Sequence, residues 1–217
     1  MEFYMMSNSS KLDPRVVKTR LNLRHALVFL MQSEKLDDIS VQKITETAHI
    51  TRGTFYLHYK DKHDFISRAM QEIIDELFDN VMINNDVDHI AEPVKVFSLN
   101  RAFDYIEKNS DIFTILLDRT QNNDFYRQFY ARLSDEMLKY GKTMHDELDE
   151  LDVPIKVQVA FMTSALLGLI AQWLNNGLIY TSRYMTSSVA KMLNTYSGDK
   201  LLLTSFFDYN VNPQIKL

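Results

Sequence analysis

The spacing of apolar residues along the chain predicts a succession of amphipathic helices. The first follows Asp13-Pro14, because aspartate is a favoured helix cap and proline is tolerated in the first helical turn. Its apolar residues recur every three or four positions until about residue 34: Leu23, Ala26, Leu27, Leu30 and Met31. The pattern therefore predicts a helix that buries one face.

Three more helices are expected directly afterwards. Ser40 is positioned to cap a short helix, and Thr51 a second short helix over 52–59, with a tight turn at His49-Ile50 between them. Asp61 is expected to cap a longer helix that ends near residue 83 and carries an apolar stripe.

The rest of the chain continues the helical pattern after a polar segment, 84–92, that we interpret as a linker. Apolar stripes predict further helical segments around 97–106, 112–117, 125–148, 154–177 and 181–196, which gives about nine helices. No strand alternation is apparent, and the tail 199–217 stays unassigned. The expected fold class is all-α.

Residues 157–182 contain no charged side chain, which raises the question of a membrane span. A span needs about 20 predominantly apolar residues, and this segment includes Gln158, Gln172, Asn175 and Asn176. We interpret it as a buried helix and expect no membrane association. The first residues carry no secretory signal, so a cytoplasmic location is expected.

Composition excludes several kinds of chemistry. The chain has no cysteine, which excludes disulfides, thiolate metal sites and a cysteine nucleophile. Its histidines form no HExxH pair, its glycines form no phosphate-binding loop, and no GxSxG occurs. The acidic residues of 146–152 lack the spacing of a calcium loop, and we interpret them as a solvated helix end. We therefore expect no enzyme activity, no metal and no cofactor.

The net charge of −5 conceals an uneven distribution. Residues 11–70 contain eleven Lys and Arg against seven Asp and Glu, whereas the remainder contains thirteen against twenty-two. The first stretch is therefore cationic at +4 and the remainder anionic at −9. Such a split suggests a cationic module attached to an acidic body.

The segment 40–62, SVQKITETAHITRGTFYLHYKDK, has the arrangement of a helix-turn-helix. The first turn of the second helix in such a unit meets base edges in the DNA major groove, and here it would present Arg52, Gly53, Thr54, Tyr56 and His58. Glycine inside a helix costs about 1 kcal/mol relative to alanine, so Gly53 suggests close approach to another backbone or to a phosphate. The alternative is an ordinary helical hairpin with solvated charges.

This stretch resembles the DNA-binding domain of TetR-family transcriptional regulators. The family signature combines an apolar residue and isoleucine, an Ala-Gly-Val turn, a Thr-x-Gly-Thr-hydrophobic-Tyr-x-His-aromatic helix and a following lysine. The resemblance covers about 14–69, and the matching positions are Val41, Ile44, Ala48, His49, Ile50, Thr51, Gly53, Thr54, Phe55, Tyr56, His58, Tyr59 and Lys62. His49 replaces the turn glycine, and we expect an intact but slightly strained turn because histidine tolerates a left-handed backbone better than most residues.

The resemblance implies a DNA-binding domain over 11–60 and a helical regulatory and dimerisation domain over 61–217, entered through the connecting helix 61–83. It implies DNA contacts from ten residues: Ser40, Gln42, Lys43, Thr51, Arg52, Gly53, Thr54, Tyr56, His58 and Lys62. Among them Arg52 is the candidate for reading a guanine, and Tyr56 and Lys62 are candidates for holding phosphates. Phe55 is interpreted as core.

The stretch 161–193 is similar to the last two helices of one branch of TetR-like regulators, where they form a four-helix dimer interface. The small residues Ala160, Ser164 and Gly168 recur every four positions and would let another helix approach closely. The expected interface consists of Ala160, Ser164, Gly168, Met185, Val189, Met192 and Leu193. Burial of the same face inside a monomer is the alternative.

Family members of this shape usually hold an inducer between the middle helices. The candidates to line such a pocket are Phe103, Phe113, Tyr126, Phe129, Phe161, Met162 and Trp173. Aromatic residues and methionine at helical spacing are also the ordinary content of a core, and no convergent polar set identifies a ligand.

The expected function is that of a sequence-specific DNA-binding regulator, acting as a homodimer on an inverted-repeat operator and modulated by a small-molecule effector. We favour a repressor, although repression and activation differ only in where the operator lies relative to the promoter. The alternative is a regulator-like DNA binder without a ligand, which acts constitutively or through a protein partner.

Overall fold

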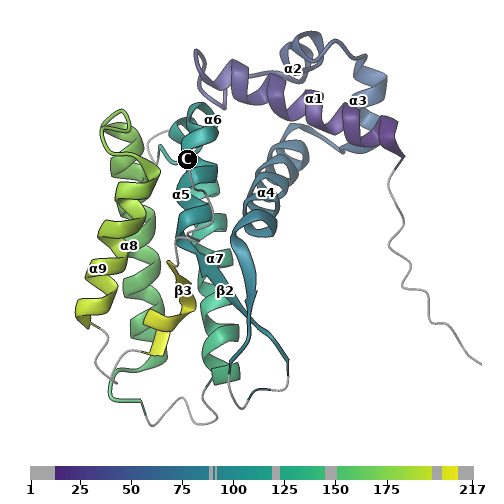
Figure 1. The fold of residues 1–217 in the computed structure, drawn as a ribbon. Coiled ribbons are helices and arrows are strands. Elements are labelled where there is room, and N and C mark those ends of the chain that lie inside the picture. Colours follow the sequence, from purple (N-terminus) through teal and green to yellow (C-terminus); the bar gives the residue numbers. More distant parts are fainter. Residues whose placement is uncertain are drawn as a thin grey trace, which may run out of the picture. The chain divides into compact units, whose positions relative to one another are not determined.

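The computed structural model describes residues 13–87, 90, 92–118, 123–144, 151–196 and 202–209. Within these ranges the chain forms nine α-helices, a short 3-10 helix and three short strands (Figure 1). The all-α prediction is therefore confirmed, whereas the strands were not predicted. The chain divides into two compact units, 1–69 and 70–217, and the boundary falls inside the fourth helix.

The first unit contains α1 (Pro14–Met31), α2 (Val41–Thr47), α3 (Arg52–His58) and the start of α4 (Lys62–Val81). The expected caps are in place. The side chain of Asp13 accepts a hydrogen bond from the amide of Arg15 at 2.8 Å, and Asp61 Oδ1 accepts one from the amide of Asp64 at 2.8 Å. Such caps satisfy amides that lack a partner within the helix and fix where each helix begins.

An aromatic cluster forms the core of this unit. The rings of Phe55 on α3 and Phe65 on α4 lie 5.4 Å apart, and the ring of Tyr59 lies 4.9 Å from Phe65. Phe55 and Phe65 are fully buried, together with Leu23 and Ile44 from α1 and α2. The interpretation of Phe55 as core is confirmed, and its burial orients the opposite side of α3 toward solvent.

The second unit contains the end of α4 and five further helices. These are α5 (Leu99–Lys108), α6 (Ser110–Leu116), α7 (Asn123–Met144), α8 (Ile155–Asn175) and α9 (Ser182–Tyr196). Helix α5 packs against α9, and α7 packs against α8. The predicted helix ends are close to those observed, except that the expected extension of α7 to about residue 148 lies outside the described residues.

The segment expected to be a linker and the first part of the next predicted helix instead form a small sheet. Strand β1 (Met82–Asn85) pairs antiparallel with β2 (Val94–Ser98), so Phe97 belongs to a strand and not to a helix. Val94 and Val96 are buried while Lys95 between them is exposed. This alternation is the signal of a strand, but it is only three residues long and was overlooked.

Part of the unassigned tail completes this sheet. After a short 3-10 helix, Leu202–Phe206, strand β3 (Phe207–Asp208) pairs in parallel with β2 and places Phe207 opposite Phe97. Phe206 is fully buried, and its ring stacks with that of Phe97 at 6.3 Å. This part of the tail is therefore core rather than an appendage.

Among the described residues, α8 alone is long and apolar enough to cross a membrane, with a mean hydropathy of 1.6 over an 18-residue window. Half of that window is buried within the protein. Core helices meet the same criteria of length and composition, and α8 packs against α6, α7 and the 3-10 helix. These contacts support the interpretation of α8 as a buried helix.

Candidate nucleic-acid interface

The turn between α2 and α3 joins the two helices tightly. His49 adopts a left-handed backbone, with φ of 54°, as the replacement of the family's glycine led us to expect. The amide of Ile50 donates to the carbonyl of Thr45 at 3.0 Å and closes the turn. The predicted left-handed conformation is confirmed, and its steric cost is the expected strain.

Both short helices begin at a hydroxyl cap. Ser40 Oγ accepts from the amide of Lys43 at 3.2 Å, and Thr51 Oγ1 accepts from the amide of Thr54 at 3.1 Å. The hydroxyl groups of Thr51 and Thr54 also lie within hydrogen-bonding distance of each other at 2.9 Å. The side chains of Ser40, Thr51 and Thr54, which are predicted DNA contacts, therefore stabilise the helix starts even without DNA.

The side of α3 that faces away from the aromatic cluster is open. Arg52 and Gly53 are exposed, Tyr56 is 56% exposed, and Leu57 is 82% exposed. A Cβ added at Gly53 would meet only Thr51 Oγ1, at an ordinary contact distance of 3.6 Å. Since no packing among the described residues requires glycine, its helix-weakening presence points to an external partner. His58 is half-buried beside the ring of Tyr59.

The start of α3 is tied to α2 through side chains. Arg52 Nη2 donates to Gln42 Oε1 at 3.1 Å, and Gln42 Nε2 donates to Glu46 Oε1 at 2.8 Å. All three residues are exposed. Two of the predicted contact residues, Gln42 and Arg52, are thereby brought together.

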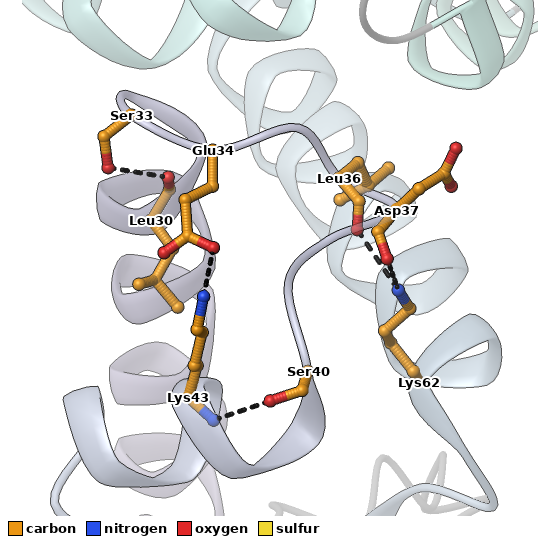
Figure 2. Close-up of polar contacts among 8 residues, drawn as sticks. All are labelled: Leu30, Ser33, Glu34, Leu36, Asp37, Ser40, Lys43 and Lys62. Carbon is orange, nitrogen blue, oxygen red and sulfur yellow. Dashed lines mark hydrogen bonds and ion pairs between the residues drawn. The ribbon is translucent and has the colours of Figure 1, made fainter.

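The two predicted lysines are engaged within the protein (Figure 2). Lys43 forms an ion pair with Glu34, near the end of α1. Lys62, from the first turn of α4, reaches the loop between α1 and α2 and donates to the carbonyl oxygens of Leu36 at 3.2 Å and Asp37 at 2.9 Å. Lys62 therefore holds the loop that leads into α2, and two of its three N–H groups are used.

A carboxylate stabilises the first turn of α4. Asp64 Oδ2 accepts from the amide of Lys60 at 3.0 Å, and Oδ1 accepts from Arg68 Nε at 2.8 Å. The hydrogen bond from the amide of Lys60, together with the one from Arg68, lowers the pKa of Asp64 below its ordinary value of 3.8. Asp64 is thus charged at neutral pH and fixes the turn between α3 and α4.

The residues expected to line an effector pocket do not converge on one cavity. Phe103, Phe113, Phe129 and Trp173 are buried in the core of the second unit, where the rings of Phe103 and Trp173 lie 5.4 Å apart. Tyr126 is half-buried. Phe161 and Met162 instead line a groove between α8 and α9. The burial of the four aromatic residues is what a packed core produces.

Three of the residues expected at a dimer interface, Val189, Met192 and Leu193, line that groove. Ala160, Ser164 and Gly168 are exposed on α8, and a Cβ added at Gly168 would meet no atom within 4 Å. The groove has a volume of about 310 Å³ and is lined by Phe161, Met162, Ala165, Leu166, Leu169, Val189, Met192, Leu193 and Phe207. Met185 is largely buried, whereas Met192 is half exposed. An apolar lining of this kind on the surface is typical of an interaction site.

Comparison with known proteins decides the family. Residues 95–195 match the TetR model for the C-terminal region of transcriptional regulators. This part of the chain is thereby identified as the C-terminal region of a TetR-type transcriptional regulator. Proteins of this family are DNA-binding transcriptional regulators and not enzymes.

Two curated relatives agree with the family. The chain is 24% identical over 199 residues to YxbF of Bacillus subtilis, an uncharacterised HTH-type transcriptional regulator; the match covers 89% of this chain and 49% of YxbF. The chain therefore spans about half the length of that relative. It is 20% identical over 130 residues to IcaR of Staphylococcus epidermidis, the negative regulator of the biofilm operon icaADBC, covering 58% of this chain and 70% of IcaR.

Solved structures share the fold. A TetR transcriptional regulator from Streptococcus agalactiae matches with a TM-score of 0.58 and 21% identity, over 82% of this chain and 94% of that one. The dihydroxyacetone kinase operon activator DhaS matches with a TM-score of 0.57 and 18% identity, over 83% of this chain and 96% of that one. At this level of identity the two structures establish the TetR fold alone.

Two carboxylates near the TetR-type helix-turn-helix were not predicted from the sequence. Glu34 pairs with Lys43, and Glu46 binds Gln42. The second had a usable signal, because Gln42 and Glu46 are four positions apart and so are neighbours on a helix surface. The first had none, since the pair forms only once the loop between α1 and α2 has folded back.

Proposed function

We propose that this TetR-family protein is a cytoplasmic repressor that binds an inverted-repeat operator as a homodimer. The observation that carries the proposal is the exposed start of α3, where Arg52 and Gly53 lie next to each other and no neighbour in the part of the chain that the structure describes requires the glycine. An arginine there can pair with guanine in the major groove, and Gly53 leaves room for close approach. Repression is favoured because IcaR is a negative regulator.

The exposed apolar residues of α8 and α9 support dimerisation. Phe161 is 56% exposed and Met192 is 50% exposed, both at the groove between these helices. The small residues Ala160, Ser164 and Gly168 leave α8 open to close approach by a second helix. A second copy of the same face would bury both features, and two-fold symmetry would make each copy cover the other.

The effector is proposed to act through α4. This helix begins in the DNA-binding unit and ends in the regulatory unit, so it connects the two parts of the chain directly. A small molecule bound in the regulatory unit would lower or raise the affinity for DNA by changing the separation of the two α3 helices in a dimer. The size of the effect is limited by the difference in the ligand's affinity for the two arrangements.

A DNA binder without a small-molecule ligand is the second candidate. It is supported by the packing of the expected pocket residues against one another, with Phe103 against Trp173 and, through Phe125, Phe113 next to Phe129. The two candidates differ in a melting experiment with extracts of the producing cells. A rise in the melting temperature that survives removal of macromolecules supports an effector, and no rise supports the second candidate.

Operator geometry tests the main proposal. Sequences bound by the full-length protein, selected from random DNA, should form an inverted repeat whose half-sites lie on one face of the duplex, about 34–36 Å or a multiple of that apart. Inserting about five base pairs rotates one half-site by half a helical turn and should abolish binding, and inserting about ten should partly restore it. Recovery of a single unrepeated site, or indifference to the five-pair insertion, would contradict the dimeric operator.

A further inference from the structure

The interactions of Arg52 extend beyond the recognition helix. Its guanidinium donates to Gln42 Oε1 at 3.1 Å, and the other end of that amide donates to Glu46 Oε1 at 2.8 Å. Both ends of the amide are therefore used, and they fix its orientation, since a flipped amide would set its oxygen against the carboxylate. Glu46 thus determines which end of Gln42 faces Arg52.

The two hydrogen bonds that link Glu46 through Gln42 to Arg52, here called the relay, leave Arg52 able to read a base. A guanidinium has five N–H groups, and a bidentate contact with guanine uses two of them. One group is committed to Gln42, so enough remain for the base. A free arginine on an exposed surface loses rotamer freedom when it binds, whereas an arginine held at one N–H is partly ordered beforehand.

We infer that Gln42 and Glu46 are positioning residues that set the base selectivity of Arg52. The inference rests on the proposed function, in which the start of α3 reads DNA. It concerns Glu46 above all, because Glu46 lies on α2 and was not among the expected contact residues. Substitution of Gln42 is harder to interpret, because its own side chain is a candidate for contacting DNA.

Simple electrostatics makes a different prediction for Glu46. A carboxylate near a DNA-binding surface repels phosphates, so its removal alone should raise affinity for every sequence and leave selectivity unchanged. In the relay, the same removal releases the amide of Gln42 and with it the guanidinium. The expected result for Glu46→Ala is therefore unchanged or higher affinity for random DNA, together with weaker discrimination at one base pair.

The experiment measures the affinity of the full-length protein for its selected operator and for all single-base variants of one half-site, at constant salt. Arg52→Ala first identifies the base pair that Arg52 reads, where discrimination should fall roughly 5- to 150-fold. Glu46→Ala should lose part of that discrimination, about 3- to 10-fold, at the same base pair and no other. Glu46→Gln keeps an acceptor oxygen and should restore it.

Two controls separate the relay from general effects. Glu34→Ala removes a carboxylate from the same unit that pairs with Lys43 and not with Arg52; it should raise affinity without altering selectivity. In an Arg52→Ala background, Glu46→Ala should change discrimination no further, which is the signature of residues acting as one unit.

The outcomes distinguish failure of the relay from failure of base reading by Arg52. If Arg52→Ala relaxes one base pair and Glu46→Ala leaves it unchanged, the relay is refuted while DNA reading by α3 stands. If Arg52→Ala relaxes no base pair, the assignment of Arg52 as a reading residue and the relay fall together. Equal effects of Glu46→Ala and Glu34→Ala on selectivity would also overturn the relay.

Discussion

The ammonium group of Lys62 lies 2.9 Å from the carbonyl oxygen of Asp37, 25 positions earlier in the chain. Together with its contact to Leu36, this bond fastens the α1–α2 loop to α4. Charge-assisted hydrogen bonds of buried groups contribute about 1.5–3 kcal/mol, and half-buried ones less. We expect Lys62→Met to lower the stability of the first unit by about 1 kcal/mol and to speed amide exchange in residues 33–40.

Lys35→Met is the matched control, because Lys35 is exposed in the same loop. It should leave exchange and DNA affinity nearly unchanged, whereas Lys62→Met should weaken binding to operator and random DNA alike. Unaltered exchange in the loop of Lys62→Met would show that the contact does not hold it.

The open surface at Gly168 gives a test of dimerisation that is separate from folding. In a single chain the added side chain of Gly168→Leu meets no atom within 4 Å at its Cβ, and leucine favours a helix over glycine by about 1 kcal/mol. At a packed seam the same change costs about 1–3 kcal/mol or more. We therefore expect Gly168→Leu to dissociate the dimer in sedimentation equilibrium while the helical circular dichroism is retained.

Lys142→Leu, at an exposed position on α7 outside the proposed interface, should leave the dimer intact. A wild-type protein that is monomeric at micromolar concentration, or a Gly168→Leu protein that stays dimeric, would remove this face from the interface.

Because His49 has a left-handed backbone, we expect two substitutions there to change stability in opposite directions. Its φ of 54° strains an L-residue, and glycine removes that strain. His49→Gly should stabilise the first unit by about 0.5–1 kcal/mol, after the greater freedom of glycine in the unfolded chain is subtracted. His49→Val should destabilise it by more than about 1 kcal/mol, because branching at Cβ is least compatible with this conformation.

Hydrogen exchange of peptides from 41–59 measures both effects, with peptides from α8 as the internal reference. Equal exchange in the glycine and valine variants would mean that the turn relaxes away from the left-handed conformation.

Because the pKa of Asp64 is lowered, we expect the first turn of α4 to lose stability in acid. The pKa of this carboxylate is lowered in the folded protein by the hydrogen bond from the Lys60 amide and by Arg68, so its stabilisation is complete above its ordinary value of 3.8 and is lost as the pH falls through the lower folded value. After correction for the intrinsic pH dependence of amide exchange, protection at the start of α4 should therefore fall below about pH 4. Asp64→Asn should remove this acid dependence, and Arg68→Ala should remove only part of it.

The first unit was readily predicted because its signals are local. Asp13, Ser40 and Thr51 each mark a helix start within a few residues, and the histidine in place of the turn glycine indicates a left-handed backbone without knowledge of the rest of the fold. The exposed side of α3 also followed, once Phe55 was assigned to the core. The contacts of Lys43 and Lys62 did not, because each depends on how a loop folds back.

The second unit was harder because its defining contacts are distant in sequence. No local pattern pairs Phe97 with Phe207, and strands of four, five and two residues show at most a three-residue alternation. The apolar character of α8 was evident, but its periodicity could not separate Trp173, which fills the core, from Phe161, which lines the groove. A core position and a pocket wall require the same residue types.

The parallel pairing of β2 with β3 imposes an order on events at the ribosome. The first unit, which ends at residue 69, is compact by itself, so it can fold while the remaining chain is still being synthesised. Strand β2 emerges early, but Phe97 has to wait for Phe206 and Phe207 before its aromatic surroundings are complete. Each nascent chain therefore passes through an interval in which a folded first unit is attached to a second unit whose sheet has an open edge, and unpaired edges of this kind favour aggregation.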